Sequence, residues 1–113
     1  MATNYIQPGD VVTVPAPSGG VVSGAGVVIG SLFGVATTTA AETVPVALAT
    51  TGVFELPKVS AQAWTVGARI YWDASGGEAT TTASTHKLIG VAVADAANPT
   101  ATGMVRLSGA FTL

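Results

Sequence analysis

The sequence predicts an all-β protein, a single compact β-barrel or β-sandwich of about eight or nine short strands. The chain is rich in Val, Thr and Gly, a composition that favours strands and tight turns. Its apolar runs are short and are separated by Gly, Pro and Ser, which is typical of strands joined by turns. Signals for long amphipathic helices are almost absent, so no other fold class competes with this prediction.

The expected strands follow one another along the chain with turn residues between them. They cover residues 10–14, 21–22, 27–36, 43–49, 52–57, 69–73, 78–82, 87–94, 104–107 and 110–113. Residues 27–36 are apolar on both faces, which predicts one strand that is either central or meets a partner with one face. We expect a hairpin about Thr50 and Thr51, a second hairpin closed by residues 75–77, and a short helical turn within residues 61–67.

The length of 113 residues suits one domain and is short for two. A turn at Pro8 and Gly9 precedes the first expected strand. Residues 1–9 are therefore expected to form an N-terminal arm, and residues 10–113 the β-domain.

Charged side chains are unusually scarce. They make up 9% of the chain, compared with roughly 25% in an average soluble domain. A monomer of this mass should expose about 5,600 Å², and ten formal charges must cover that area. Such a surface tends to associate, which predicts burial in an oligomer or on a larger assembly. The alternative is a monomer kept soluble by Thr and Ser.

Several classes of partner and compartment are not expected. The four basic residues are scattered along the chain: Lys58, Arg69, Lys87 and Arg106. Because phosphate binding needs basic residues grouped together, we expect no nucleic-acid contact. Because the chain has no Cys, folding needs no oxidising compartment. Its first residues lack the basic and apolar regions of a signal peptide. Residues 27–36 span half of the about 20 apolar residues that a membrane helix needs, so no membrane association is expected.

The search for catalytic chemistry finds no convincing constellation. The one histidine, His86, lies in a polar stretch that predicts an exposed loop, and no Gly-x-Ser-x-Gly motif accompanies it. Residues 26–31 have the glycines of a phosphate loop but lack its lysine. The six carboxylates are single and widely spaced, which disfavours a metal site. We therefore expect no enzyme, no cofactor, and no catalytic or metal-binding residues.

Three aromatic residues leave an alternative function open. Trp64, Tyr71 and Trp72 could form a stacking platform for a sugar, which would make the chain a carbohydrate-binding or adhesive module on a virion or cell surface. Trp72 alternates with Tyr71 in an expected strand, so core packing is the favoured interpretation of Trp72. Trp64, on the irregular segment, is expected to cover one end of the barrel.

An ordered series of short segments resembles a known family. The segments are Gly-Val-Val-Ser-Gly at 20–24, Gly-Ser-Leu-Phe-Gly-Val-Ala at 30–36, Gly-Val-Phe-Glu-Leu-Pro-Lys at 52–58, Val-Gly-Ala-Arg-Ile-Tyr-Trp-Asp at 66–73, Ile-Gly-Val-Ala at 89–92 and Val-Arg-Leu at 105–107. In this order the chain resembles the small phage capsid cement, or decoration, proteins, over nearly its whole length. Members of this family were sometimes labelled predicted phage recombinases. That label conflicts with the absence of a phosphate loop and of a large α/β domain.

The resemblance implies a structural virion protein that binds the outer surface of a tailed-phage capsid and stabilises the head. The implied partners are the major capsid protein and further copies of the chain, with a homotrimer favoured over a dimer because closed symmetry suits local capsid axes. Assembly would take place in the bacterial host cytoplasm. The candidate contact residues are Ala2, Thr3, Asn4, Tyr5, Ile6, Gln7, Pro8 and Trp64, although a frayed terminus explains the arm equally well.

Overall fold

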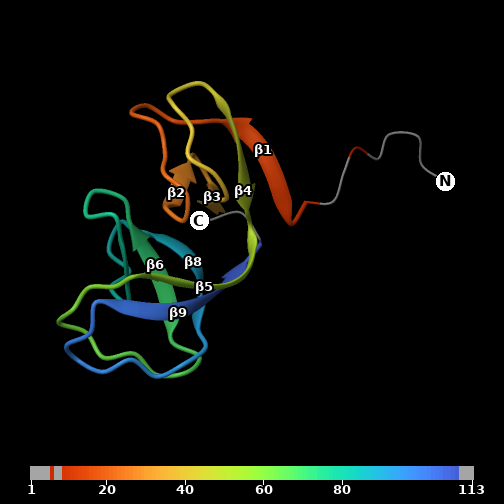
Figure 1. The fold of residues 1–113 in the computed structure, drawn as a ribbon. Helices are drawn as coiled ribbons and strands as arrows, with labels where there is room; N and C mark the ends of the chain where they lie inside the picture. The colour runs from red at the N-terminus through yellow and green to blue at the C-terminus, as the bar shows by residue number, and fades with distance from the viewer. Residues whose placement is uncertain (1–5, 7–8, 110–113) are drawn as a thin grey trace.

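The computed structural model describes residues 6 and 9–109, which form nine strands in two antiparallel sheets (Figure 1). The first sheet has the order β1 (Val11–Pro15), β4 (Pro45–Ala49), β3 (Leu32–Ala36) and β2 (Gly26–Ile29). The second has the order β5 (Thr51–Pro57), β9 (Thr102–Ser108), β8 (Lys87–Ala92), β6 (Arg69–Asp73) and β7 (Glu78–Thr80). The predicted all-β class is confirmed.

The two sheets make a sandwich-like arrangement and not a closed barrel. The second sheet curls strongly, and an isolated parallel bridge between Lys58 and Ala79 brings the end of β5 to the opposite edge strand, β7. Its core is completed from outside, because Phe33 and Val35 of the first sheet pack into the same cluster of buried side chains. The sandwich alternative of the prediction is therefore the correct one.

The prediction of one strand over residues 27–36 is wrong. The segment is the β2–β3 hairpin, in which Ile29 pairs with Leu32 across a turn at Gly30 and Ser31. Gly30 has a φ of 59°, a left-handed conformation that glycine adopts without a steric penalty. The two apolar faces of this segment belong to two short strands, and β3 is the inner one.

The expected hairpin about Thr50 and Thr51 is also wrong. β4 ends at Ala49 and β5 begins at Thr51, yet β4 pairs with β1 and β3 whereas β5 pairs with β9. The chain changes sheet at Thr50, which is 5% exposed. The Thr50 amide donates to the Asp10 carbonyl at 2.8 Å, and its hydroxyl lies 2.8 Å from the Gly9 carbonyl and 3.1 Å from that of Asp10.

Residues 61–67 contain no helical turn. Trp64 forms an isolated antiparallel bridge with Ala96, and its amide donates to the Ala96 carbonyl at 2.8 Å. Residues 21–22 are likewise no strand, since Val21 only bridges Ala40. The expected hairpin closed by residues 75–77 is confirmed by the pairing of β6 with β7. The expected strand at residues 110–113 lies outside the described residues.

The buried side chains form two clusters, one on each side of the first sheet. The larger lies between the sheets, where the ring centroids of Phe33 and Trp72 are 5.3 Å apart and the rings are tilted by 53°. The smaller lies on the opposite face of the first sheet and includes Val27, Val46 and Leu48. Within the described part of the chain, no helix is long and apolar enough to cross a membrane.

We expect Thr50→Val to lower the free energy of unfolding by about 1 to 2 kcal/mol, because the buried Thr50 side chain no longer donates to the Gly9 carbonyl while its shape is retained. Chemical denaturation measures this change. Thr51→Val is the matched control, since Thr51 is the exposed neighbour, and its effect should stay within about 0.5 kcal/mol. Equal effects of the two substitutions would contradict the role assigned to Thr50.

Candidate functional site

Most of the predicted contact arm lies outside the described residues: Ala2, Thr3, Asn4, Tyr5, Gln7 and Pro8. Ile6 is described and is 86% exposed. A large aliphatic side chain with that exposure is available to a partner. The role of residues 1–9 as a contact arm, and their separation from the domain at residue 10, remain predictions.

Trp64, the other predicted contact residue, is 2% exposed and belongs to the core cluster between the sheets. Its six-membered ring lies directly over Gly103, where a Cβ atom would overlap the ring. Its Nε1 is buried without a hydrogen-bond partner. The side chain therefore offers no exposed area to a neighbouring subunit or to the capsid, and its observed role is packing.

The three aromatic residues do not assemble into a stacking platform. Trp72 is 5% exposed and packs on Phe33, as its alternation with Tyr71 predicts. Trp64 is buried, and Tyr71 is half-buried on the outer side of β6. Because a sugar-binding platform needs exposed rings on one surface, the observation that motivated the carbohydrate-binding alternative is lost.

Lys58, one of the four basic residues scattered along the chain, is a buried cation. It is 2% exposed, and its Nζ donates to the carbonyls of Val59 and Thr100 at 3.0 and 3.4 Å. The Nζ also lies 5.9 Å from the centroid of the Trp64 ring. Nothing in the sequence around Pro57 predicts that Lys58 is buried. Because Lys58 is buried, nine of the ten formal charges remain for the surface.

A cleft of about 630 Å³ opens beside the junction of the two sheets. It is lined by the loop at residues 17–22, residues 25–28 of the β2 hairpin, residues 39–41, Trp72 and Ala74. None of these side chains is ionisable. The cleft could receive a small apolar group, but it contains no acid, base or nucleophile pair with which to act on one.

A smaller pocket of about 300 Å³ contains Asp73, Ser75 and His86. The connections between them are not those of a catalytic triad. The Ser75 hydroxyl donates to Asp73 at 2.8 Å, whereas a triad places the histidine between the nucleophile and the acid. His86 is half-buried rather than exposed as predicted, and no hydrogen bond joins its ring to either residue.

Asp73 is held by its own turn. Its Oδ1 accepts hydrogen bonds from the Ser75 hydroxyl and from the Ser75 and Gly76 amides, at 2.8, 3.1 and 3.1 Å. The Ser75 hydroxyl and the Gly76 amide, with help from the nearby charge of His86, lower the pKa of Asp73 below 3.8. The Asp73 carboxylate therefore stabilises the turn of the β6–β7 hairpin. No cluster of three or more metal-binding side chains exists among residues 6 and 9–109.

The comparison with protein families decides the classification. The model of a family described as "Phage cement protein" matches residues 6–107, which is most of the chain. The chain belongs to the phage cement protein family. Comparison with curated proteins and with solved structures gave no match.

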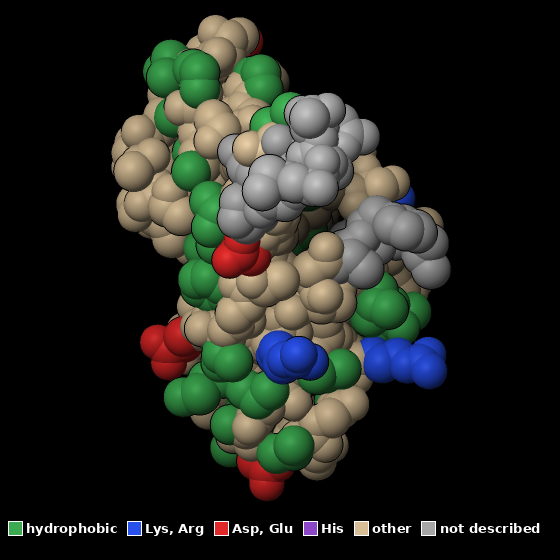
Figure 2. Space-filling view, turned by 90° about the vertical axis from the view of Figure 1, so that its right-hand side faces the viewer, with side chains coloured by type: hydrophobic (Ala, Val, Ile, Leu, Met, Phe, Trp, Pro, Cys, Tyr) green, Lys and Arg blue, Asp and Glu red, His purple; other side chains and the backbone are tan. Residues whose placement is uncertain are grey.

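For a cement protein, the relevant site is a surface that meets the capsid and not a catalytic pocket. The family is structural, and its members associate with phage capsids, which places this protein on the virion. The described surface carries exposed aliphatic side chains between few charges: Ile6, Val11, Val22, Val44, Val53, Val66 and Met104. The space-filling view shows such hydrophobic atoms spread over one side of the molecule (Figure 2).

We expect Gly103→Ala to destabilise this cement protein by about 1 to 3 kcal/mol, because the added Cβ overlaps the buried Trp64 ring. Thermal or chemical denaturation measures the loss. Gly9→Ala is the matched control, since no heavy atom lies within 4 Å of a Cβ built there. A neutral Gly103→Ala substitution would show that the Trp64 ring does not lie on Gly103.

Asp73→Asn should lower the Tm at neutral pH, because the turn loses a charged acceptor. The higher Tm of the parent protein relative to the variant is fully present at pH values above 3.8, the pKa of the carboxyl in the unfolded chain. This difference in Tm is lost as the pH falls through the lower pKa of Asp73 in the folded state. Melting curves from neutral to acidic pH measure it. Asp10→Asn makes the same charge change outside this turn, and a difference in Tm for Asp73→Asn that persists at acidic pH would contradict the prediction.

Proposed function

We propose that this cement protein binds the outer surface of a tailed-phage capsid, where it contacts the major capsid protein and stabilises the head without catalysing a reaction. The family match supports the capsid as the site of action. We further propose that it acts as a homotrimer, with a dimer as the second choice, and that it joins the capsid in the cytoplasm of the bacterial host.

The observation that carries the proposal is the combination of a charge-poor surface with a sealed core. Nine charged side chains remain for an accessible surface of 6388 Å², while both tryptophans, which could have served as binding groups, are buried. A rigid body of this kind loses little conformational entropy when it binds. Several weak contacts from one symmetric oligomer can then add up through effective concentration, which suits a repetitive capsid surface.

Co-sedimentation of the purified protein with undecorated, expanded heads tests the capsid role. We expect saturable binding and a higher temperature of genome release from the decorated heads. The protein spun without heads, and unexpanded precursor heads, are the controls. The proposal is wrong if the heads neither bind the protein nor gain resistance to heat or osmotic shock. Light scattering of the free protein tests the proposed trimer separately.

A further inference from the structure

The register of the second sheet aligns four outward-facing side chains in one row. Val53 on β5 pairs with Arg106 on β9, Arg106 pairs with Val91 on β8, and Val91 pairs with Arg69 on β6. Paired residues in a sheet share a face. Residues 105 and 107, the chain neighbours of Arg106, are buried, so this row lies on the face that points away from the core. We call it the Val–Arg row.

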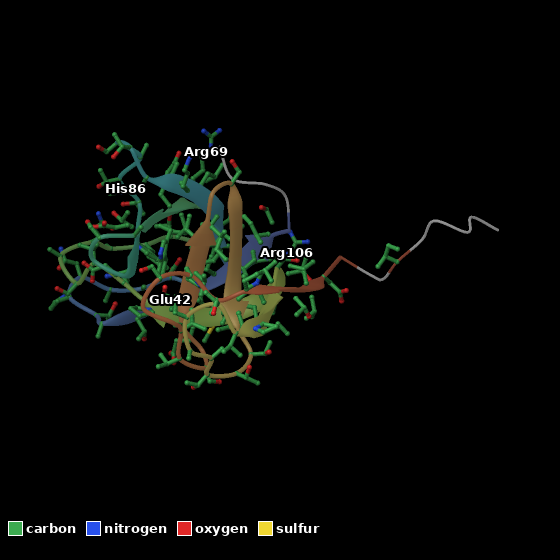
Figure 3. All side chains as sticks on the ribbon, turned by 90° about the horizontal axis from the view of Figure 1, so that it is seen from above. Glu42, Arg69, His86 and Arg106 are labelled. Atoms are coloured by element: carbon green, nitrogen blue, oxygen red, sulfur yellow. The ribbon has the colours of Figure 1, made fainter. Side chains whose placement is uncertain are left out.

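The row contains both arginines of the chain. Each is exposed, and neither forms an ion pair with a described residue. Two strand spacings separate β6 from β9, which places the two Cα atoms about 10 Å apart. Figure 3 labels both side chains, with Arg69 at the upper edge of the view and Arg106 below it and to its right. In a protein with so few charges, two guanidinium groups that no described carboxylate neutralises stand on one face, where they could bind an external anion.

Apolar side chains accompany the two charges. Val53 is 56% exposed, and Met104, two residues before Arg106 on β9, is 47% exposed. Arginine and methionine are enriched in protein interfaces, whereas lysine is depleted. The composition is therefore that of a protein-binding surface.

From this arrangement we infer that the Val–Arg row is the capsid-docking surface and that its occupant is a carboxylate-bearing apolar strip on the capsid subunit. The inference rests on the proposed function. Guanidinium groups bind carboxylates through two parallel hydrogen bonds, which gives both affinity and orientation. Two carboxylates about 10 Å apart, flanked by aliphatic side chains, would match the row.

Other occupants fit less well. A second copy docked through the same row would present the same two arginines, and the row itself contains no carboxylate to meet them. Four of the six carboxylates of the chain already accept a hydrogen bond from a described residue: Glu42, Glu55, Asp73 and Asp95. A nucleic-acid backbone would need more than two cations and would be repelled by Glu55, which lies beside Met104 on the same face.

Arg106→Gln tests the row, with Lys87→Gln as the matched control, because it removes the same charge from the same sheet away from the row. We expect Arg106→Gln to weaken binding to expanded heads about 10- to 100-fold, the loss of one charge-assisted pair, while Lys87→Gln binds as the parent does. Arg106→Lys should recover only part of the affinity, because it restores the charge without the bidentate geometry. Melting curves confirm that each variant is folded.

The outcomes separate the two proposals. If the parent protein binds heads and Arg106→Gln binds equally well, the docking surface is overturned while the capsid role stands. If the parent protein itself does not bind, the proposed function fails, and the docking surface fails with it. If Arg106→Gln instead reduces the mass of the free oligomer, the row is a contact between copies of the chain, and the assignment to the capsid is overturned.

Discussion

The architecture depends on how the chain passes through Thr50. One residue separates β4 from β5, so the last strand of the first sheet and the first strand of the second sheet cannot move independently. Thr50 holds this crossing by bonding, through its amide and its hydroxyl, to the carbonyls of Asp10 and Gly9 at the entrance to β1. A hydroxyl at this buried position replaces the water that the carbonyls would otherwise need. Figure 1 shows the result, with β4 running directly into β5 between the two sheets.

Side-chain packing completes what this crossing begins. Phe33 and Val35 extend from the first sheet into the core of the second, where Phe33 meets Trp72. Because these large apolar groups are used to join the sheets, they are withdrawn from the surface. The contact that joins the sheets therefore withdraws Phe33 and Trp72 from any binding role.

The sequence predicted the strands better than it predicted their partners. The strands at β1, β6, β8 and β9 and the β6–β7 hairpin were predictable because alternation and turn residues are local signals. The errors at residues 27–36 and at Thr50 both concern where the chain turns and which strand it then joins. Gly30 is one of several glycines in an apolar run, so the sequence does not mark it as the turn. The segments on either side of Thr50 are adjacent in the chain, which is also the pattern of a hairpin. The local sequence around Thr50 does not predict that β5 pairs with β9, because β9 lies about fifty residues further along the chain.

The amino-acid sequence by itself determined the all-β class and the scarcity of charge, since these follow from composition and from residues close together in the chain. Only the tertiary structure decided that Trp64 and Lys58 are buried and that Arg69 and Arg106 share one row. The physical reason is that a strand's alternation assigns its residues to two faces without saying which face is covered. The register between distant strands and the side chains of the opposing sheet make that choice. The scarcity of charge thus follows from the sequence alone, whereas the placement of the two arginines on one open face is a property of the fold.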